Sequence, residues 1–134
     1  MGLVDPADLK LDGFSAHLGL TLTEVSSDVV RGSMEIGPEH HQPGGLVHGG
    51  VYSSVVELAA SCGASVWFGD RGHVVGTSNQ TDFIRGISEG TLTVEATPLH
   101  RGRSRQLWQV FITDQDGRLI AKGDVELANI TGAS

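Results

Sequence analysis

The pattern of hydrophobic and polar residues predicts one long helix with strands before and after it. Residues 51–68 are mostly small or apolar, a run too long for a typical strand. Shorter segments on both sides alternate between apolar and polar positions, which is the period of a half-buried strand. These segments span residues 19–25, 30–36, 74–84, 91–99, 106–113 and 119–127. Turn-prone pairs separate them, at Ser27-Asp28, Glu89-Gly90, Arg101-Gly102 and Asp116-Gly117.

This order of elements favours an α+β fold in a single domain over residues 1–134. The helix is apolar around most of its circumference, and the sheet needs one face covered, so we expect the sheet to curl around the helix. The spacing of the last four segments is typical of an antiparallel meander. The prediction is a sheet of five to six antiparallel strands wrapped around one long central helix. A length of 134 residues is usual for one domain.

Charge and cysteine content narrow the classes of function. Sixteen Asp and Glu against nine Lys and Arg give a formal charge of −7, which disfavours a general binder of nucleic acid or anionic membranes. The single cysteine, Cys62, excludes an internal disulfide and fits a reducing compartment. Residues 1–10 lack the apolar core of a secretory signal. We therefore expect a cytoplasmic protein.

The apolar run 51–68 is also near the lower length limit of a membrane-spanning helix. It contains Glu57 and several serines, and no cluster of Lys and Arg flanks it. A carboxylate near the centre of a bilayer is costly. The sequence therefore favours a helix buried in the core of the domain.

A glycine-rich segment, Gln42–Gly50, leads directly into the predicted helix and carries His48. Glycines let the backbone approach a ligand closely. A helix that begins at residues 48–50 directs free N–H groups and the positive end of its dipole outward, which suits a developing oxyanion or a polarised carbonyl. A glycine-rich loop with no function explains these residues equally well.

Glu57 is the one formally charged residue between Gly49 and Gly69. Ser54 and Ser61 share its side of the helix, so the polar stripe is narrow. A stripe that merely faces solvent normally collects several charges, including Lys or Arg at i+4. We therefore favour a functional carboxylate over a solvated one, acting as general base or as nucleophile.

Over nearly its whole length the chain resembles the hotdog thioesterase superfamily. The likeness is greatest to the branch that includes the Arthrobacter-type 4-hydroxybenzoyl-CoA thioesterase and the phenylacetate-pathway thioesterases. It is carried by Gln42, the turn 48–50, Glu57 and Ser61, in the order and spacing typical of that branch. Residues 79–85 and 98–102 are similar to the branch's strand segments that border the coenzyme A site.

The resemblance implies an acyl-CoA thioesterase that hydrolyses an aromatic or medium-chain acyl group and needs no cofactor and no metal. Gly49 would donate its N–H to the thioester oxygen, and Gln42 and His48 would hold that end of the site. Glu57 would attack the carbonyl or activate water, and Ser61 would orient the carboxylate or the water. The expected substrate-binding residues are Gly50, Ser54, Asp82, Phe83, Arg85, Arg101, Arg103 and Ser104.

The arginines of that set are candidates for the coenzyme A phosphates, which an acidic protein must meet with local positive charge. Arg105 is a further candidate. A solvated hairpin tip explains the cluster at residues 101–105 equally well. The histidines at 40, 41 and 48 lack ligands at a convincing spacing for zinc. Cys62 has no evident base and is interpreted as a small buried hydrophobe.

Gly49 and Glu57 are eight positions apart, which is roughly 12 Å along a helix. One carbonyl cannot contact both groups, because each must lie about 3 Å from the reacting atoms. A two-fold dimer resolves this if the helix start of one subunit faces Glu57 of the other. The resemblance implies the same dimer, often paired into a homotetramer. We expect two equivalent sites per dimer.

Two other functions remain open at this stage. A hotdog hydratase or dehydratase would need an acid and base pair acting on the α and β carbons of the substrate. Its catalytic histidine typically lies farther upstream of the helix acid than the nine residues from His48 to Glu57. A non-catalytic acyl-CoA-binding protein would keep the pocket without turnover, and the joint presence of Gln42, Glu57 and Ser61 counts against it.

Overall fold

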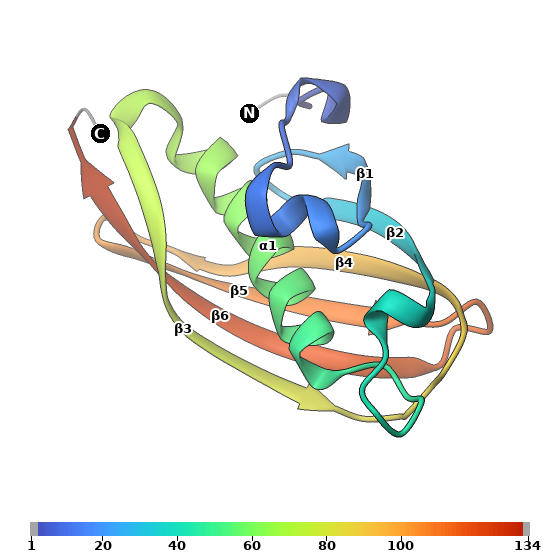
Figure 1. The fold of residues 1–134 in the computed structure, drawn as a ribbon. Coiled ribbons are helices and arrows are strands. Elements are labelled where there is room, and N and C mark those ends of the chain that lie inside the picture. Colours follow the sequence, from blue (N-terminus) through green and yellow to red (C-terminus); the bar gives the residue numbers. More distant parts are fainter. Residues whose placement is uncertain (1–2, 133–134) are drawn as a thin grey trace.

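The computed structural model describes residues 3–132, in which a six-stranded sheet curls around one long helix (Figure 1). The helix is α1 (Gly49–Phe68). The strands are β1 (Thr21–Val25), β2 (Val30–Ile36), β3 (Gly72–Phe83), β4 (Gly90–Arg101), β5 (Arg105–Thr113) and β6 (Leu119–Thr131). Four short 3-10 helices accompany them: η1 (Pro6–Asp8), η2 (Gly13–His17), η3 (Pro38–His40) and η4 (Gly69–Arg71). This architecture confirms the predicted α+β hotdog fold.

The sheet is antiparallel throughout, with the strand order β1-β2-β4-β5-β6-β3. β1 and β2 form the expected hairpin, and the Ser26 hydroxyl accepts hydrogen bonds from the N–H groups of Asp28 and Val29 in its turn. β4, β5 and β6 form a meander, but β3 does not extend it. β3 pairs instead with β6 at the far edge, because β2 occupies the other side of β4. The outer edge of β3 is therefore unpaired within the described chain.

The buried face of α1 carries small and β-branched side chains. Val55, Val56, Ala59, Ala60 and Ala64 are at most 1% exposed. Such short side chains let the helix axis approach the sheet closely. One close approach is at Gly63, where a β-carbon would lie 2.4 Å from the ring of Trp108 on β5.

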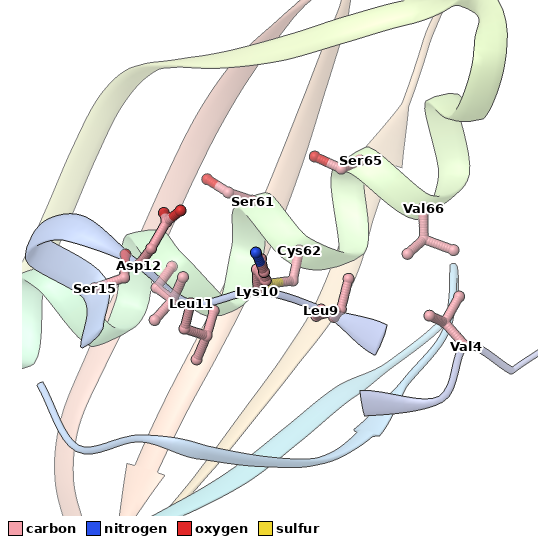
Figure 2. A pocket seen from close by; sticks show the side chains of 11 residues that line it. Val4, Leu9, Lys10, Leu11, Asp12, Ser15, Ser61, Cys62, Ser65 and Val66 are labelled. Carbon is pink, nitrogen blue, oxygen red and sulfur yellow. The ribbon is translucent and has the colours of Figure 1, made fainter. Parts of the chain in front are cut away.

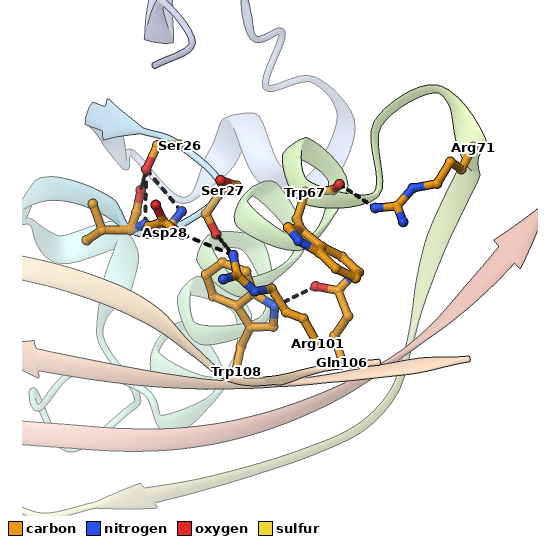
Figure 3. A network of polar contacts seen from close by, with 9 residues as sticks. Ser26, Ser27, Asp28, Trp67, Arg71, Arg101, Gln106 and Trp108 are labelled. Atoms are coloured by element: carbon orange, nitrogen blue, oxygen red, sulfur yellow. Dashed lines mark hydrogen bonds and ion pairs between the residues drawn. The ribbon is translucent and has the colours of Figure 1, made fainter. Parts of the chain in front are cut away.

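Trp108 is held in place by a buried amide network. Its indole N–H donates to Oε1 of Gln106 at 2.8 Å (Figure 3). The Gln106 amide group donates to the carbonyl of Ala64 at 3.2 Å and to Oδ1 of Asn129 at 2.9 Å. Gln106 is fully buried, and each of these bonds satisfies a polar group that would otherwise be costly. The network ties α1 to β5 and β6.

Residues 3–20 lie along the side of α1 that faces away from the sheet (Figure 1). At one end the Val4 N–H donates to the Val25 carbonyl at 2.8 Å. At the other end His40 is 4% exposed, and its Nε2 lies 2.8 Å from the Leu18 carbonyl. Leu9 and Leu11 pack between these anchors against the core. This N-terminal segment therefore forms a fixed wall beside the helix.

By length and composition alone, the stretch Gly49–Arg71 is apolar enough to cross a membrane, with a mean hydropathy of 1.2. A helix in the core of a domain passes the same test, and 44% of this window is buried. The sheet on one side and the N-terminal segment on the other account for that burial.

The contact between Gly63 and Trp108 generates a stability prediction. Gly63→Ala gains helix propensity worth about 1 kcal/mol, but the new methyl meets a ring that Gln106 prevents from moving. Overpacking of this kind costs about 1–3 kcal/mol, so we expect a lower free energy of unfolding in urea denaturation. Gly86→Ala is the control, because its nearest neighbour is the exposed and flexible side chain of Leu46. Equal or greater stability of Gly63→Ala would show that the helix can lift from the sheet.

Candidate active site

The start of α1 is shaped by His48, its N-cap residue. Nδ1 of His48 accepts a hydrogen bond from the Gly50 N–H at 2.8 Å. The N–H of His48 donates to the carbonyl of His40 at 2.8 Å, so the cap is tied to a buried residue. The Gly49 N–H has no hydrogen-bond partner among residues 3–132. It is a free donor at the positive end of the helix dipole, as an oxyanion site requires.

The glycine at position 49 leaves room for the ring of Phe83, which lies against it. A β-carbon at this position would come within 2.4 Å of that ring. The ring also packs on Tyr52, with centroids 5.9 Å apart. The end of β3 is therefore held directly beside the start of α1.

The loop before the helix, residues 42–47, is held in shape by hydrogen bonds between its own residues. The Gln42 N–H donates to the Leu46 carbonyl at 2.7 Å, and Oε1 of Gln42 accepts from the Gly44 N–H. His41 pairs with Val47, and its Nε2 lies 2.6 Å from the carbonyl of Ser88. Gln42 therefore shapes the loop through its oxygen, while its amide nitrogen makes no hydrogen bond within the described chain.

Glu57 is exposed and lies two turns farther along α1, beside β3. Its Oε1 accepts a hydrogen bond from Nδ2 of Asn79 at 3.4 Å, and a β-carbon on Gly76 would lie 3.4 Å from Oε2. The carboxylate thus rests against the backbone of the edge strand. Within one chain, Gly49 is about 12 Å away along the helix axis.

Asn79 is a site residue that sequence reasoning placed only within a bordering segment. Its Nδ2 also donates to the Ser53 carbonyl at 2.9 Å, and its Oδ1 accepts from the Thr81 hydroxyl at 2.7 Å. These partners fix the amide so that it presents a donor to Glu57. The expected partner Ser61 lines the same hollow but makes no hydrogen bond to the carboxylate. The alternation of β3 could have revealed Asn79, because residues 79, 81 and 83 share one face of the strand, the face toward α1.

Glu57 lines a hollow of 420 Å³ together with Ser54, Ser61, Leu58 and Phe14. Phe14 belongs to the N-terminal segment and is 70% exposed, a feature that sequence reasoning did not single out. Ser54 donates its hydroxyl to the Gly50 carbonyl at 2.7 Å. Sequence-predicted residues from the middle and the start of α1 therefore line one continuous strip of surface.

The remaining predicted residues fall into two groups at opposite ends of α1. Asp82, Phe83 and Arg85 follow β3 to the start of the helix, where Gly50 also lies. Arg101 ends β4, and Arg103 and Ser104 lie in the turn between β4 and β5, near the last turn of α1. The helix of 20 residues is about 30 Å long, so one chain does not bring the two groups together.

Arg101 has structural partners. Its guanidinium donates to the Ser27 carbonyl at 2.6 Å, pairs with Asp28 at 3.2 Å and lies over the ring of Trp67 (Figure 3). It thereby ties the β4–β5 turn to the β1–β2 hairpin and to α1. Arg105 pairs with Glu126 at 3.7 Å. A contact of these arginines with coenzyme A stays a prediction that would require Arg101 to leave these partners.

The placement of the metal-ligating side chains and of the single cysteine can be read from the described chain. Among residues 3–132, no group of three or more His, Cys, Asp or Glu side chains is placed to hold a metal ion. Burial raises the pKa of the Cys62 thiol to about 11. At neutral pH this side chain is therefore a thiol rather than a nucleophilic thiolate.

Comparison with known proteins agrees with this geometry. The model of the thioesterase superfamily matches residues 44–121, which include the helix start, Glu57 and Asn79. A Mycobacterium tuberculosis protein with the proposed activity of an esterase is 46% identical over 129 residues, which are 93% of this chain and 92% of that protein.

Solved structures agree as well. The structure of the M. tuberculosis protein has a TM-score of 0.87 at 45% identity, covering 89% of this chain and 97% of that one. AziG of S. sahachiroi has a TM-score of 0.90 at 42% identity, covering 92% and 100%. A Haemophilus influenzae thioesterase has a TM-score of 0.81 at 28% identity, covering 87% and 81%.

Proposed function

Because the chain belongs to the thioesterase superfamily, we propose that it is an acyl-CoA thioesterase with Glu57 as its catalytic carboxylate. The superfamily and the esterase-like relatives support hydrolysis of thioesters or esters in general. Within the superfamily, we propose the branch of the Arthrobacter-type 4-hydroxybenzoyl-CoA thioesterase, with an aromatic or medium-chain acyl group.

One observation carries this proposal: Glu57 is held by Asn79 beside an open strand edge, while the free Gly49 N–H lies at the start of the same helix. In the general-base route, Glu57 takes a proton from water while the water oxygen bonds to the thioester carbonyl carbon. In the nucleophilic route, the Glu57 carboxylate bonds to that carbon itself, and water later hydrolyses the acyl-glutamyl anhydride that forms. In both routes the carbonyl oxygen becomes an oxyanion and is stabilised by the Gly49 N–H and the helix dipole. The C–S bond then breaks, and coenzyme A leaves as a thiolate that takes up the proton released by water, so that the products are the free acid and coenzyme A.

The distance between the two groups requires a second copy of the chain. A carbonyl carbon must lie about 3 Å from the attacking atom and its oxygen about 3 Å from the donor, whereas Gly49 and Glu57 are about 12 Å apart in one helix. We propose that Glu57 of one protomer works with Gly49 of its partner. Such a dimer has two equivalent sites.

β3 is the surface that suits this dimer. It is twelve residues long, lies at the edge of the sheet, and contains one carboxylate and no Lys, Arg or Pro. Proteins normally protect such an edge with charges, proline or a covering element. A second copy of β3, antiparallel across a two-fold axis, would pair these backbone groups and extend the sheet.

The chemistry also selects the register of that pairing. On β3, Gly76 and Asn79 lie beside Glu57, and Phe83 lies beside Gly49 of the same chain. In a two-fold antiparallel pair, residues equally far from the axis face each other. If the two-fold axis passes close to Gln80, Phe83 of the partner therefore lies opposite the part of β3 that is beside Glu57. That register also sets Asp82 opposite Ser78 of the partner rather than opposite another carboxylate.

The catalytic role of Glu57 is tested by thiol release from a panel of aromatic and aliphatic acyl-CoAs. We expect Glu57→Gln to lower kcat by about 10²–10⁴-fold, the usual contribution of a general base. Asn79→Ala should lower kcat about tenfold with a smaller change in KM, because it leaves the carboxylate present but unoriented. Glu95→Gln is the matched control on β4, where the carboxylate pairs with Arg31.

Full activity of Glu57→Gln would reject the catalytic role of this residue. If the wild-type protein released no thiol from any acyl-CoA of the panel, the hydrolase proposal would fail in favour of an acyl-CoA-binding protein.

The shared site is tested by mixing Glu57→Gln with Gly49→Ala after joint denaturation and refolding. Gly49→Ala keeps the backbone N–H, but its methyl group meets the ring of Phe83 and should displace the helix start, so we expect each variant alone to be inactive. A heterodimer with a shared site has one intact pair, formed by Glu57 of one chain and Gly49 of the other. Random pairing should therefore restore about one quarter of the wild-type kcat. If each chain contained its own complete site, every site in the mixture would contain one of the two substitutions, and no activity would return.

The register is tested by disulfide cross-linking in a Cys62→Ser background, with single cysteines placed at positions 76–84. A residue at the two-fold axis faces its own copy, and opposite residues in antiparallel strands have Cα atoms about 4.5–5.5 Å apart, within the range of a disulfide. We expect the greatest yield of covalent dimer for Gln80→Cys. A maximum at residue 76 or 84, or no cross-link at any position, would reject this register.

A further inference from the structure

Resting on the proposed thioesterase function, we infer that the acyl group is a linear chain of medium length, bound between the N-terminal segment and the second half of α1. A hollow of 460 Å³ occupies this place (Figure 2). Ligand pockets for small molecules have volumes of roughly 300–1,000 Å³. The hollow therefore has the size of a substrate subsite.

Apolar side chains make up most of the surface of the hollow, and its polar lining residues are Lys10, Asp12, Ser15, Ser61 and Ser65. Leu58, Cys62 and Val66 form the helix side, at the i, i+4 and i+8 spacing that aligns side chains along one face. Val4, Leu9 and Leu11 form the opposite side, and in Figure 2 Cys62 and Val66 extend from the helix toward that segment. Because Cys62 is protonated at neutral pH, it adds an apolar surface. An alkyl chain gains free energy by leaving water for such walls.

The wall formed by the N-terminal segment is built into the fold. The segment is anchored by the hydrogen bond between Val4 and Val25 at one end and by that between Leu18 and His40 at the other. Leu9 and Leu11 pack against the core between the anchors. The width of the hollow is therefore set before any ligand binds.

The hollow is continuous with the catalytic carboxylate. It shares Ser15, Leu58 and Ser61 with the hollow that contains Glu57. An acyl chain whose carbonyl carbon lies at Glu57 can therefore run directly into it. From Glu57 to Val66 the helix rises nine residues, about 13.5 Å. That length fits roughly ten carbons of an extended chain, since a C–C bond of about 1.5 Å advances a zigzag chain by ~1.3 Å.

A second hollow of 390 Å³ lies in the opposite direction from Glu57, toward the start of α1. Phe14, Leu18 and Val51 line it together with four histidines and Glu39. An alkyl chain in this hollow would take hydration from the exposed side chains of His17 and Glu39. An aromatic acyl group would fill only the part of the apolar hollow next to Glu57 and would leave its far end, at Val66 and Val4, unused.

The kinetic test compares acyl-CoAs from butyryl to palmitoyl, together with benzoyl-CoA. For the wild-type protein we expect kcat/KM to rise about two- to fourfold per methylene and to level off near decanoyl. Val66→Phe should shorten this optimum by several carbons and lower decanoyl-CoA turnover at least tenfold, while butyryl-CoA turnover stays near the wild-type value. Ile130→Phe is the matched control, because Ile130 is 40% exposed on β6 and lies outside the hollow.

A flat dependence on chain length, or an equal loss for all substrates in Val66→Phe, would overturn the inference. Retained butyryl-CoA turnover shows that the variant is folded.

A binding test is independent of turnover and leaves the hollow unaltered. Cys62 is the single thiol of the chain, so a methanethiosulfonate reagent labels this position alone. In Glu57→Gln, decanoyl-CoA should slow the labelling of Cys62 at least fivefold, whereas acetyl-CoA and free coenzyme A should leave it unchanged. Equal protection by acetyl-CoA and decanoyl-CoA, or none by either, would overturn the inference. Protection by decanoyl-CoA alone, without hydrolysis in the wild-type protein, would support this subsite while the hydrolase proposal fails.

Discussion

The structure depends on the close approach of α1 to the concave face of the sheet, and glycines make that approach possible at three places. Gly49 receives the ring of Phe83, Gly63 receives the ring of Trp108, and Gly123 of β6 receives the side chain of Val56. In each case a β-carbon would come closer than 3 Å to its neighbour. Because the three contacts are spread along the helix, they fix both its height above the sheet and its position along the strands. Every other feature of the site follows from this placement.

With the helix fixed, its exposed stripe becomes a bounded strip of surface. β3 borders it on one side and the N-terminal segment on the other. Glu57, Ser54 and Ser61 lie on the floor of this strip, while the face of the helix toward the sheet is buried. A single carboxylate in such a place is well hydrated in one chain. A second chain across β3 would exclude water from the strip and strengthen each electrostatic contact in it.

The rigidity of α1 also explains why the proposed site needs two copies. A helix keeps Gly49 and Glu57 at a fixed separation, so no side-chain movement brings both to one carbonyl. The proposed two-fold axis near Gln80 would bring the donor end of one helix beside the acid of the other. In this arrangement dimerisation would serve catalysis directly. The N-terminal segment, on the far side of the strip, would remain free to bind the acyl group.

Much of the local structure follows from the sequence by itself. The helix over residues 51–68, the β1–β2 hairpin at Ser27-Asp28 and the six strands were predicted because periodicity and turn chemistry depend on neighbouring residues. The isolation of Glu57 in an apolar helix marked it as a candidate for the same reason. Only the tertiary structure decided that β3 lies beside β6, that Asn79 rather than Ser61 forms a hydrogen bond with Glu57, and that Arg101 pairs with Asp28. These outcomes join residues from 22 to 73 positions apart, and such contacts are selected by the packing of the whole chain, which no local pattern encodes.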